Sequence, residues 1–281
     1  MPTEQKIEWM PTLADKVLQL KERLRVMDSV IVAFSAGSDS TFLAAVAREV
    51  LGAKALAVTA TSPSFPEREL REACDLARSL GLNHRVISSN EMANPDYANN
   101  PLSRCYHCKT ELFGLLRGMA DAEGFAHIVD GTNKDDLKDY RPGRKAAMEN
   151  VVESPLQELG FTKQDIRDAS RKMGLKTADK PAFSCLASRF PYGEKITVEG
   201  LKSVEQAENG LRDLGFTNLR VRAHGDIARI ELPSEDIARA AAPAMREEIV
   251  ALLSSAGFRY VSLDLQGYRQ GSLNEVFRPL R

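Results

Sequence analysis

The sequence predicts an α/β fold with a mostly parallel sheet, followed by a small α+β region near the C-terminus. Strand-like and helix-like segments alternate between residues 30 and 132 at the spacing of βαβ units, which favours parallel strands. The first strand, beginning at Val30, is apolar without alternation, as is typical of a strand buried on both faces. From Thr197 the order changes to helix, hairpin, helix and strand, which is typical of an α+β unit.

The elements of the parallel region follow from apolar periodicity and from the residues that begin or end helices. An amphipathic helix precedes the first strand, and Gly52 is expected to end the helix that starts near Thr41. Pro66 opens the next helix, and Thr162 is the expected N-cap of a later one. The expected helices are 11–27, 41–50, 67–80, 109–124 and 162–174, and the expected strands are 30–34, 54–60, 83–89 and 127–132.

The C-terminal region is expected to contain one hairpin between two helices and a final strand. The hairpin strands, 219–223 and 227–232, flank the turn His224-Gly225-Asp226. The helices are expected over 198–215 and 234–256, and the final strand over 259–265. Residues 89–105 and 180–193 are expected to be loops, and 142–159 irregular or short helices. We therefore predict two domains, residues 1–194 and 195–281.

Composition limits the classes of function. Of the 281 residues, 43% are hydrophobic and 27% are charged, which is typical of a soluble globular protein. The formal net charge of −1 provides no overall field for nucleic acid, so we do not expect a nucleic-acid partner. The apolar runs are too short to span a bilayer, and the charged N-terminus lacks an apolar signal core. We expect no membrane partner and a cytoplasmic location.

The turn after the first strand is the first candidate binding site. It reads Ser-Ala-Gly-Ser-Asp-Ser (35–40) and leads into a helix, so backbone N–H groups and hydroxyls meet at a helix N-terminus. This arrangement favours phosphate binding, with an ordinary strand-to-helix turn as the alternative. Residues 59–62 and 130–136 also follow strands and are expected at the same edge of the sheet. The candidate nucleotide-binding residues here are Ala33, Phe34, Ser35, Gly37, Ser38, Asp39, Ser40 and Thr59.

This turn is not the Gly-x-x-x-x-Gly-Lys-Ser phosphate loop, because no lysine follows it. It resembles the Ser-Gly-Gly-x-Asp-Ser loop of the PP-loop ATPases, adenine nucleotide alpha hydrolase-like enzymes that split ATP between its α and β phosphates. The resemblance implies that ATP binds here and that Asp39 holds Mg²⁺ beside the pyrophosphate. The loop departs from the pattern at Ala36, where a positive φ would cost an alanine about 1 kcal/mol or more. That departure is compatible with weak ATP binding and does not imply an inactive site.

A second candidate constellation follows the fourth expected strand. It reads Asp-Gly-Thr-Asn-Lys-Asp-Asp (130–136), and its alternative interpretation is a solvated acidic turn. If it lies beside the phosphate turn, Gly131 and Thr132 contact the nucleotide and Asp135 shares the metal. Arg141 and Arg144 are then placed to meet phosphate bidentately.

The cysteines form a third candidate site. Cys74 lies in the middle of an expected helix and is interpreted as a buried filler. Cys105 and Cys108 form a lone Cys-x-x-Cys pair, which is compatible with zinc, iron–sulfur or redox chemistry or with chance. Together with Cys185 they would suit a [4Fe–4S] cluster with one open iron. Thiolate, which a nucleophile also needs, is favoured by the neighbouring basic residues Arg104, Lys109 and Arg189.

Several stretches taken together resemble one family, LarE, the ATP-dependent sulfur transferases that help to build the nickel-pincer nucleotide of lactate racemase. They are Arg-Cys-Tyr-x-Cys-Lys, Asp-Gly-Thr-Asn-x-Asp-Asp, Asp-Tyr-Arg-Pro-Gly, Lys-Pro-x-x-x-Cys-Leu-Ala-Ser-Arg-x-Pro-Tyr-Gly and Val-Arg-x-His-Gly-Asp-x-Ala-Arg-Ile-Glu. The resemblance covers about residues 10–265 and is most specific around Cys185, which corresponds to the family's sulfur-bearing cysteine. Some members sacrifice that cysteine's sulfur and keep dehydroalanine, whereas others transfer sulfide from a [4Fe–4S] cluster on three cysteines. The three positions Cys105, Cys108 and Cys185 favour the cluster type.

The resemblance implies a substrate and a sequence of steps. The substrate is a pyridinium bis-carboxylate mononucleotide, each carboxylate of which is adenylated by ATP and then converted to a thiocarboxylate. Cys185 is the implied catalytic residue, and Ser188, Arg189 and Arg222 are the implied substrate-binding residues, with Arg229 as a further candidate. The alternative interpretation of Arg222 and Arg229 is that they are exposed surface residues without a role in binding. Relatives assemble as homo-oligomers, so the resemblance also implies a homo-oligomer.

Two other functions remain open from the sequence. A tRNA thiolase of the PP-loop group also combines adenylation with sulfur, but it would need a basic tract for the RNA backbone. A non-catalytic nucleotide-binding module is the alternative that Ala36 suggests.

Overall fold

The computed structural model describes residues 11–138, 142–181, 184–269 and 271–273. Its residues form two compact units, which are described separately. The first is Met1–Ala60, Arg68–Ser89 and Lys109–Phe183, and the second is Thr61–Glu67, Asn90–Cys108 and Ser184–Arg281. The domain boundary at residues 194/195 stays a prediction, because these units follow spatial contacts rather than chain order.

A four-stranded sheet with the order β3-β2-β1-β4 organises the first unit. Its central strand β1 pairs in parallel with both neighbours, so Val30 lies opposite Ala55 on one side and His127 on the other. The predicted α/β class with a parallel sheet is confirmed. The strands are β1 (Val30–Ala33), β2 (Ala55–Thr61), β3 (Asn83–Ser88) and β4 (His127–Val129).

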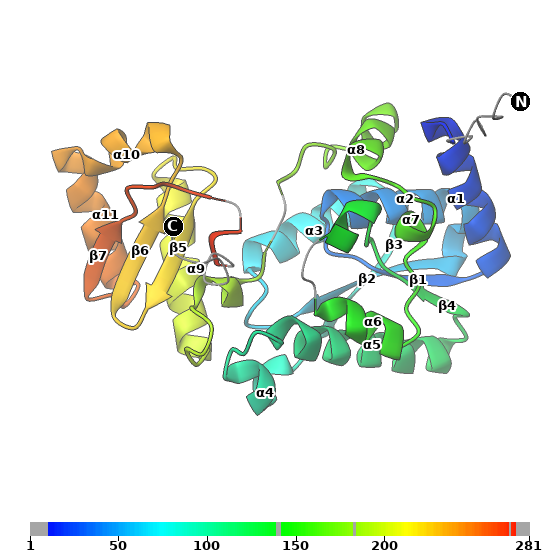
Figure 1. The fold of residues 1–281 in the computed structure, drawn as a ribbon, viewed down its shortest axis with the longest axis horizontal. Coiled ribbons are helices and arrows are strands. Elements are labelled where there is room, and N and C mark those ends of the chain that lie inside the picture. Colours follow the sequence, from blue (N-terminus) through cyan, green and yellow to red (C-terminus); the bar gives the residue numbers. More distant parts are fainter. Residues whose placement is uncertain (1–10, 139–141, 182–183, 270, 274–281) are drawn as a thin grey trace, which may run out of the picture. The chain divides into compact units, whose positions relative to one another are not determined.

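Helices cover both faces of this sheet. α1, α2 and α8 lie on one face and α5 lies on the other (Figure 1). Val30 and Val32 of β1 belong to one apolar core with Leu20, Leu24, Phe42 and Phe161, which are fully buried. Burying each such side chain contributes about 1.5–3 kcal/mol. The helices are α1 (Leu13–Met27), α2 (Ser38–Leu51), α3 (Glu67–Ser79), α5 (Arg104–Glu123), α6 (Gly143–Glu149), α7 (Pro155–Glu158) and α8 (Lys163–Lys172).

The chain order places the phosphate turn at a topological switch. After β3 the chain returns past β1 to form β4 on its other side, so the order reverses between β1 and β4. Ligands of open parallel sheets bind beyond the carboxyl ends of the strands at such a point. The turn at 35–40 and the segment at 130–136 follow these two strands.

The second unit is built on the three-stranded sheet β5-β6-β7. β5 (Arg220–His224) and β6 (Ile227–Glu231) form the predicted antiparallel hairpin, and β7 (Tyr260–Leu263) pairs with β6 in parallel. Val221, Ala223, Ala228 and Ile230 belong to one apolar core with residues of the helices. Because strand side chains alternate, arginines occupy the opposite face of β5 and β6. The helices of this unit are α4 (Pro95–Ala98), α9 (Val198–Asp213), α10 (Ser234–Ala241) and α11 (Pro243–Ser255).

Three predicted helix boundaries are wrong. α2 begins at Ser38 rather than near Thr41, and α5 begins at Arg104 rather than at Lys109, so Ser38–Ser40 and Cys105 lie in first helical turns. The expected single helix over 234–256 is two helices, because Pro243 lacks an N–H and disfavours helical backbone at Ala242, which has ψ of 140°.

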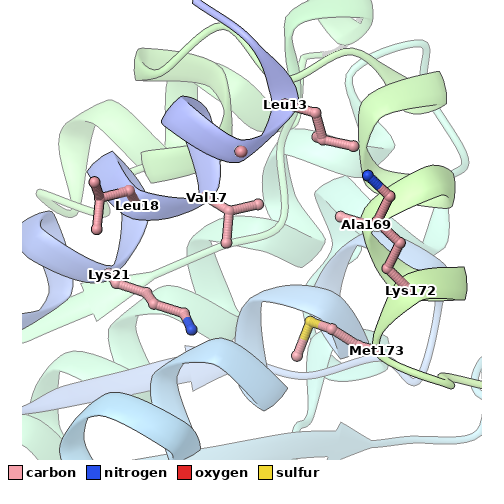
Figure 2. A pocket seen from close by; sticks show the side chains of 8 residues that line it. Leu13, Val17, Leu18, Lys21, Ala169, Lys172 and Met173 are labelled. Carbon is pink, nitrogen blue, oxygen red and sulfur yellow. The ribbon is translucent and has the colours of Figure 1, made fainter.

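A shallow apolar groove lies between α1 and α8 on the first unit (Figure 2). None of its lining residues comes from the turn at 35–40 or from residues 130–136, so this groove is not the candidate site. Its lining residues are Leu13, Ala14, Val17, Leu18, Lys21, Ala169, Lys172 and Met173. Across the described segments, no helix is both long and apolar enough to cross a membrane.

Candidate functional site

The turn after β1 presents backbone and hydroxyl donors at the N-terminus of α2. The first bond of the helical ladder is Thr41 N to Gly37 O at 3.0 Å, and the amides before it are the orphan donors of a helix N-terminus. Ser35 N donates to Ser40 Oγ at 3.3 Å, and the hydroxyls of these two serines are 3.2 Å apart. The turn is therefore preorganised for an anion, as a pyrophosphate loop requires.

Ala36 has a positive φ of 54° and is fully buried. The position thus does need the left-handed conformation that glycine adopts without strain, and the alanine bears a cost of about 1 kcal/mol or more. The loop forms nonetheless, because Ala36 packs into the main apolar core of the first unit.

Lys163, the first residue of α8, reaches this turn. Its Nζ lies 2.8 Å from both carboxylate oxygens of Asp39 and 2.6 Å from Ser38 Oγ. Its backbone N donates to Asp135 Oδ2 at 2.9 Å. No sequence motif predicts this contact, because Lys163 is 124 residues from Asp39. One local signal could have found it: a lysine in the first turn of a helix opposes the helix dipole and needs an anion nearby.

The carboxylates here suit magnesium held mainly by phosphates. Asp39 lies beside the helix N-terminus with its side chain about one quarter exposed. Mg²⁺ in nucleotide sites uses one or two carboxylates and otherwise phosphate and water oxygens, so Asp39 fits this role and Asp135 lies within the same hydrogen-bond network.

Gly131 lies in direct contact with the start of α2. A Cβ built on Gly131 would be 2.8 Å from Ser40 N and 3.1 Å from the carbonyl carbon of Asp39. Only glycine permits this approach. Thr132 is held by Asp130, whose carboxylate accepts from Thr132 N at 3.0 Å and Thr132 Oγ1 at 2.8 Å. The predicted juxtaposition of residues 130–136 and the turn at 35–40 is present within the first unit.

Thr59, Arg144 and Arg141 are the other residues predicted to contact the nucleotide or its phosphates in this part of the chain. Thr59 is buried, and its Oγ1 lies 2.9 Å from Phe34 O and 2.9 Å from His84 Nε2, so it ties the end of β2 to the turn. Burial lowers the pKa of His84 below its ordinary value. Arg144 lies in the first turn of α6, and Arg141 lies outside the described residues.

The three candidate cysteines belong to the second unit. Cys105 and Cys108 lie one turn apart at the start of α5, Cys105 being exposed and Cys108 half-buried. Cys185 is half-buried and packs with Cys108 against the same apolar core. Burial, with the nearby Cys185 and Cys108 thiols, raises the pKa of Tyr97 well above its ordinary value. Burial alone would lower the pKa of Arg104, but the Cys185 and Cys105 thiols raise it above its ordinary value.

The sequence predicts a metal-bound role for these three thiols. In the described parts of the chain, no three cysteine, histidine, aspartate or glutamate side chains are close enough together to hold a metal ion. The predicted [4Fe–4S] cluster on Cys105, Cys108 and Cys185 therefore finds no support in this structure.

Arg189 holds the segment that carries Cys185. Its Nε and Nη2 donate to Glu208 at 2.8 and 3.0 Å, and its Nη1 donates to the carbonyl oxygens of Ser184 and Cys185 at 2.8 and 2.9 Å. Both charged side chains are nearly fully buried. Burial would raise the pKa of Glu208, but the Arg189 charge outweighs it and the pKa lies below its ordinary value. The predicted substrate contact of Arg189 stays a prediction.

Arg222 makes a similar pair with Glu231. Its Nε and Nη2 each lie 3.0 Å from a Glu231 oxygen, while its Nη1 donates to Ser188 O at 2.7 Å. Arg229 also donates to Glu231, at 3.1 Å, and its buried Nε has no hydrogen-bond partner in the described part of the chain. The roles of Ser188 and Arg222 toward substrate stay predictions, and the structure adds Glu208 and Glu231 as the carboxylates that hold the two arginines.

Comparison with known proteins bears on both units. The family model described as NAD synthase matches residues 13–99, which include the turn at 35–40. An uncharacterized protein of Synechocystis sp. is 47% identical over 94% of this chain and 98% of its own length. The pyridinium-3,5-bisthiocarboxylic acid mononucleotide synthase of Lactiplantibacillus plantarum is 40% identical over 95% of this chain and 96% of its own. An uncharacterized protein of Methanocaldococcus jannaschii is 30% identical over 90% of this chain and 97% of its own length.

Proposed function

Because this chain belongs to the LarE family of ATP-dependent PP-loop enzymes, we propose that it converts the carboxylates of a pyridinium bis-carboxylate mononucleotide to thiocarboxylates. The observation that carries the proposal is the 40% identity over 95% of the chain to a synthase of the bisthiocarboxylic acid mononucleotide. The Lactiplantibacillus plantarum name identifies that protein's product, and the same substrate class is proposed for this chain. A cytoplasmic location and a homo-oligomer are parts of the proposal.

The first step is adenylation in the first unit. A substrate carboxylate oxygen attacks the α-phosphorus of ATP, the bond to the β-phosphate breaks, and pyrophosphate leaves with the negative charge. Amides of the turn at 35–40 and the Lys163 ammonium stabilise that charge, because they are fixed donors beside the leaving group. Mg²⁺ at Asp39 supplies Lewis-acid neutralisation of the same phosphates when bound.

The second step is sulfur transfer at Cys185. The Cys185 thiolate attacks the acyl adenylate, a C–S bond forms, and AMP leaves with the electron pair of the broken C–O bond. A base then takes the Cα proton of Cys185, the Cβ–S bond breaks, and the thiocarboxylate leaves with the sulfur. Dehydroalanine remains, so each chain supplies one sulfur and loses one H₂S, about 34 Da.

A single-turnover experiment tests this function. Purified protein is mixed with ATP, Mg²⁺ and the bis-carboxylate mononucleotide, and AMP, pyrophosphate, thiocarboxylate and the mass of the chain are measured. We expect all three products and the mass loss at Cys185. Cys185→Ala should release pyrophosphate without thiocarboxylate, while the matched control Cys74→Ala, on α3, should behave as wild type.

Two results would refute parts of the proposal. Absence of both AMP and thiocarboxylate from the wild-type protein would refute the function. Repeated turnover of iron- and sulfide-loaded protein with an intact Cys185 would refute the sacrificial route and restore the cluster on Cys105, Cys108 and Cys185.

A further inference from the structure

Two cysteine-bearing segments of the second unit are joined by one buried asparagine. Asn100 is fully buried and has a positive φ of 54°. Its Nδ2 donates to Pro191 O at 2.7 Å and to Phe190 O at 3.3 Å, and its backbone O accepts from Gly193 N at 2.9 Å. Asn100 therefore ties residues 90–108, which carry Cys105 and Cys108, to residues 184–193, which carry Cys185.

Arg104 makes the second half of this link. Its Nη1 donates to Asn100 Oδ1 and, at 3.0 Å, to Ala187 O, two residues beyond Cys185. Its guanidinium lies 5.7 Å from the centre of the Tyr192 ring. The side chain is 2% exposed and, among the residues that the structure describes, forms no ion pair with a carboxylate.

Arg104 is thus a buried cation that has no carboxylate partner within the described ranges. Buried charges in proteins are normally paired, because an isolated buried charge is costly. Instead, the titratable groups that raise the pKa of Arg104 are the Cys185 and Cys105 thiols first and the Tyr97 and Tyr192 hydroxyls after them. The same guanidinium thus anchors the Cys185 segment and brings positive charge to the thiols.

We infer that Asn100 and Arg104 are positioning residues that hold the Cys185 segment against the start of α5 and so set the geometry of sulfur transfer. The inference rests on the proposed function for the reaction that is positioned, but the link itself consists of contacts within the chain. Asn100 touches neither ATP nor the reacting carboxylate in this account, so adenylation should not need it.

The test separates sulfur transfer from adenylation in single-turnover reactions. Asn100→Gly removes the side-chain hydrogen bonds but keeps the positive φ accessible, and Arg104→Met removes the donor and the charge. A misplacement of reacting groups by about 1 Å costs on the order of 100-fold in rate. We expect thiocarboxylate formation to fall by about that factor, with pyrophosphate release and the KM for ATP unchanged.

Two further measurements make the test specific. The double variant should be no slower than either single variant, because each change breaks the same link. Hydrogen exchange of residues 184–196 should accelerate in the ligand-free variants, since Gly193 N and Ile196 N bond to Asn100 O and Ala98 O. That readout needs no catalysis, so it tests the link even if the wild-type protein makes no thiocarboxylate.

Matched controls come from the same unit. Asn218 also has a positive φ, 47°, and is exposed, so Asn218→Gly repeats the substitution away from the link. Arg239, which pairs with Asp236, donates to Leu214 O and Gly215 O, so Arg239→Met removes an arginine of the same unit that lies away from the link. The inference is overturned if Asn100→Gly and Arg104→Met keep the wild-type ratio of thiocarboxylate to pyrophosphate. It is also overturned if either control variant lowers that ratio as much as they do.

Discussion

The Lys163 ammonium lies 2.8 Å from both carboxylate oxygens of Asp39, across the start of α2. The turn at 35–40 lacks the lysine of the common phosphate loop, and α8 supplies one from a distant part of the sequence. The Lys163 ammonium is thus a cation beside the turn at 35–40. The hydrogen bond from the Lys163 backbone N to the Asp135 carboxylate helps to position it.

Lys163→Met should weaken ATP binding. Hydrogen bonds to charged groups are worth about 1.5–3 kcal/mol, and the Lys163 side chain is 30% exposed, so we expect the lower end, about a tenfold rise in the KM for ATP. Pyrophosphate release against ATP concentration measures it. Lys16→Met is the control, because it breaks an ion pair between Lys16 of α1 and Asp165, which lies on α8 like Lys163. An equal rise in both variants would contradict a role for Lys163 at the phosphates.

Gly131→Ala should displace the first turn of α2. The added Cβ would meet Ser40 N at 2.8 Å, a backbone atom that cannot move without the helix. We expect loss of stability by about 1–3 kcal/mol, as for other overpacked sites, and loss of ATP binding. Gly114→Ala on α5 has open space and should be neutral or stabilising by up to about 1 kcal/mol. Urea unfolding and ATP titration of both variants check this, and tight ATP binding by Gly131→Ala would contradict it.

Ala36→Gly should strengthen ATP binding with little change in stability. Glycine relieves the left-handed strain, worth about 1 kcal/mol, but loses a buried methyl worth about 0.8 kcal/mol. The two terms nearly cancel, while the backbone becomes more accessible to phosphate. Calorimetric titration with ATP measures the affinity. Val151→Gly, at another positive φ, should leave the affinity unchanged, and an unchanged affinity in Ala36→Gly would show that the methyl does not obstruct phosphate.

Stability should fall as the pH drops below about 6.5, partly through His84. Its folded pKa is lowered by burial, so below the ordinary value of 6.5 the unfolded chain binds more protons than the folded one. His84 therefore contributes stability above that pH and loses it as the pH falls toward the folded pKa. Urea unfolding at about pH 7 and about pH 5.5 should show a smaller pH dependence for His84→Gln than for wild type. An identical dependence would contradict this assignment.

Tyr97→Phe should not destabilise the second unit. Among the residues that the structure describes, the buried Tyr97 hydroxyl has no hydrogen-bond partner, and the nearby Ser64 hydroxyl donates to Glu91 at 2.8 Å. Removing an unsatisfied polar group is neutral or stabilising by up to about 1 kcal/mol. Tyr97→Ala should cost about 3–5 kcal/mol through the cavity that it leaves. Thermal unfolding of both variants measures these changes in stability. A clear loss of stability in Tyr97→Phe would mean that the hydroxyl has a hydrogen-bond partner in solution.

Sequence reasoning placed the first unit well because its signals are local. The apolar run at Val30, the turn at 35–40 and the capping residue Thr162 act within a few residues, and each lies where it was predicted. The helix starts at Ser38 and Arg104 were missed, because the last residues before a helix differ little in composition from its first turn.

Local apolar patterns and short motifs were enough to predict the α/β class, the turn at 35–40 and the cysteine that carries the family resemblance. The tertiary structure decided which distant groups complete the sites. Lys163 reaches Asp39, and Asn100 and Arg104 bind the Cys185 segment, only after strands and helices far apart in sequence have packed together. The physical reason is that these contacts are single hydrogen bonds and ion pairs, whose partners are chosen by the packing of the apolar core and leave no periodic trace in the chain.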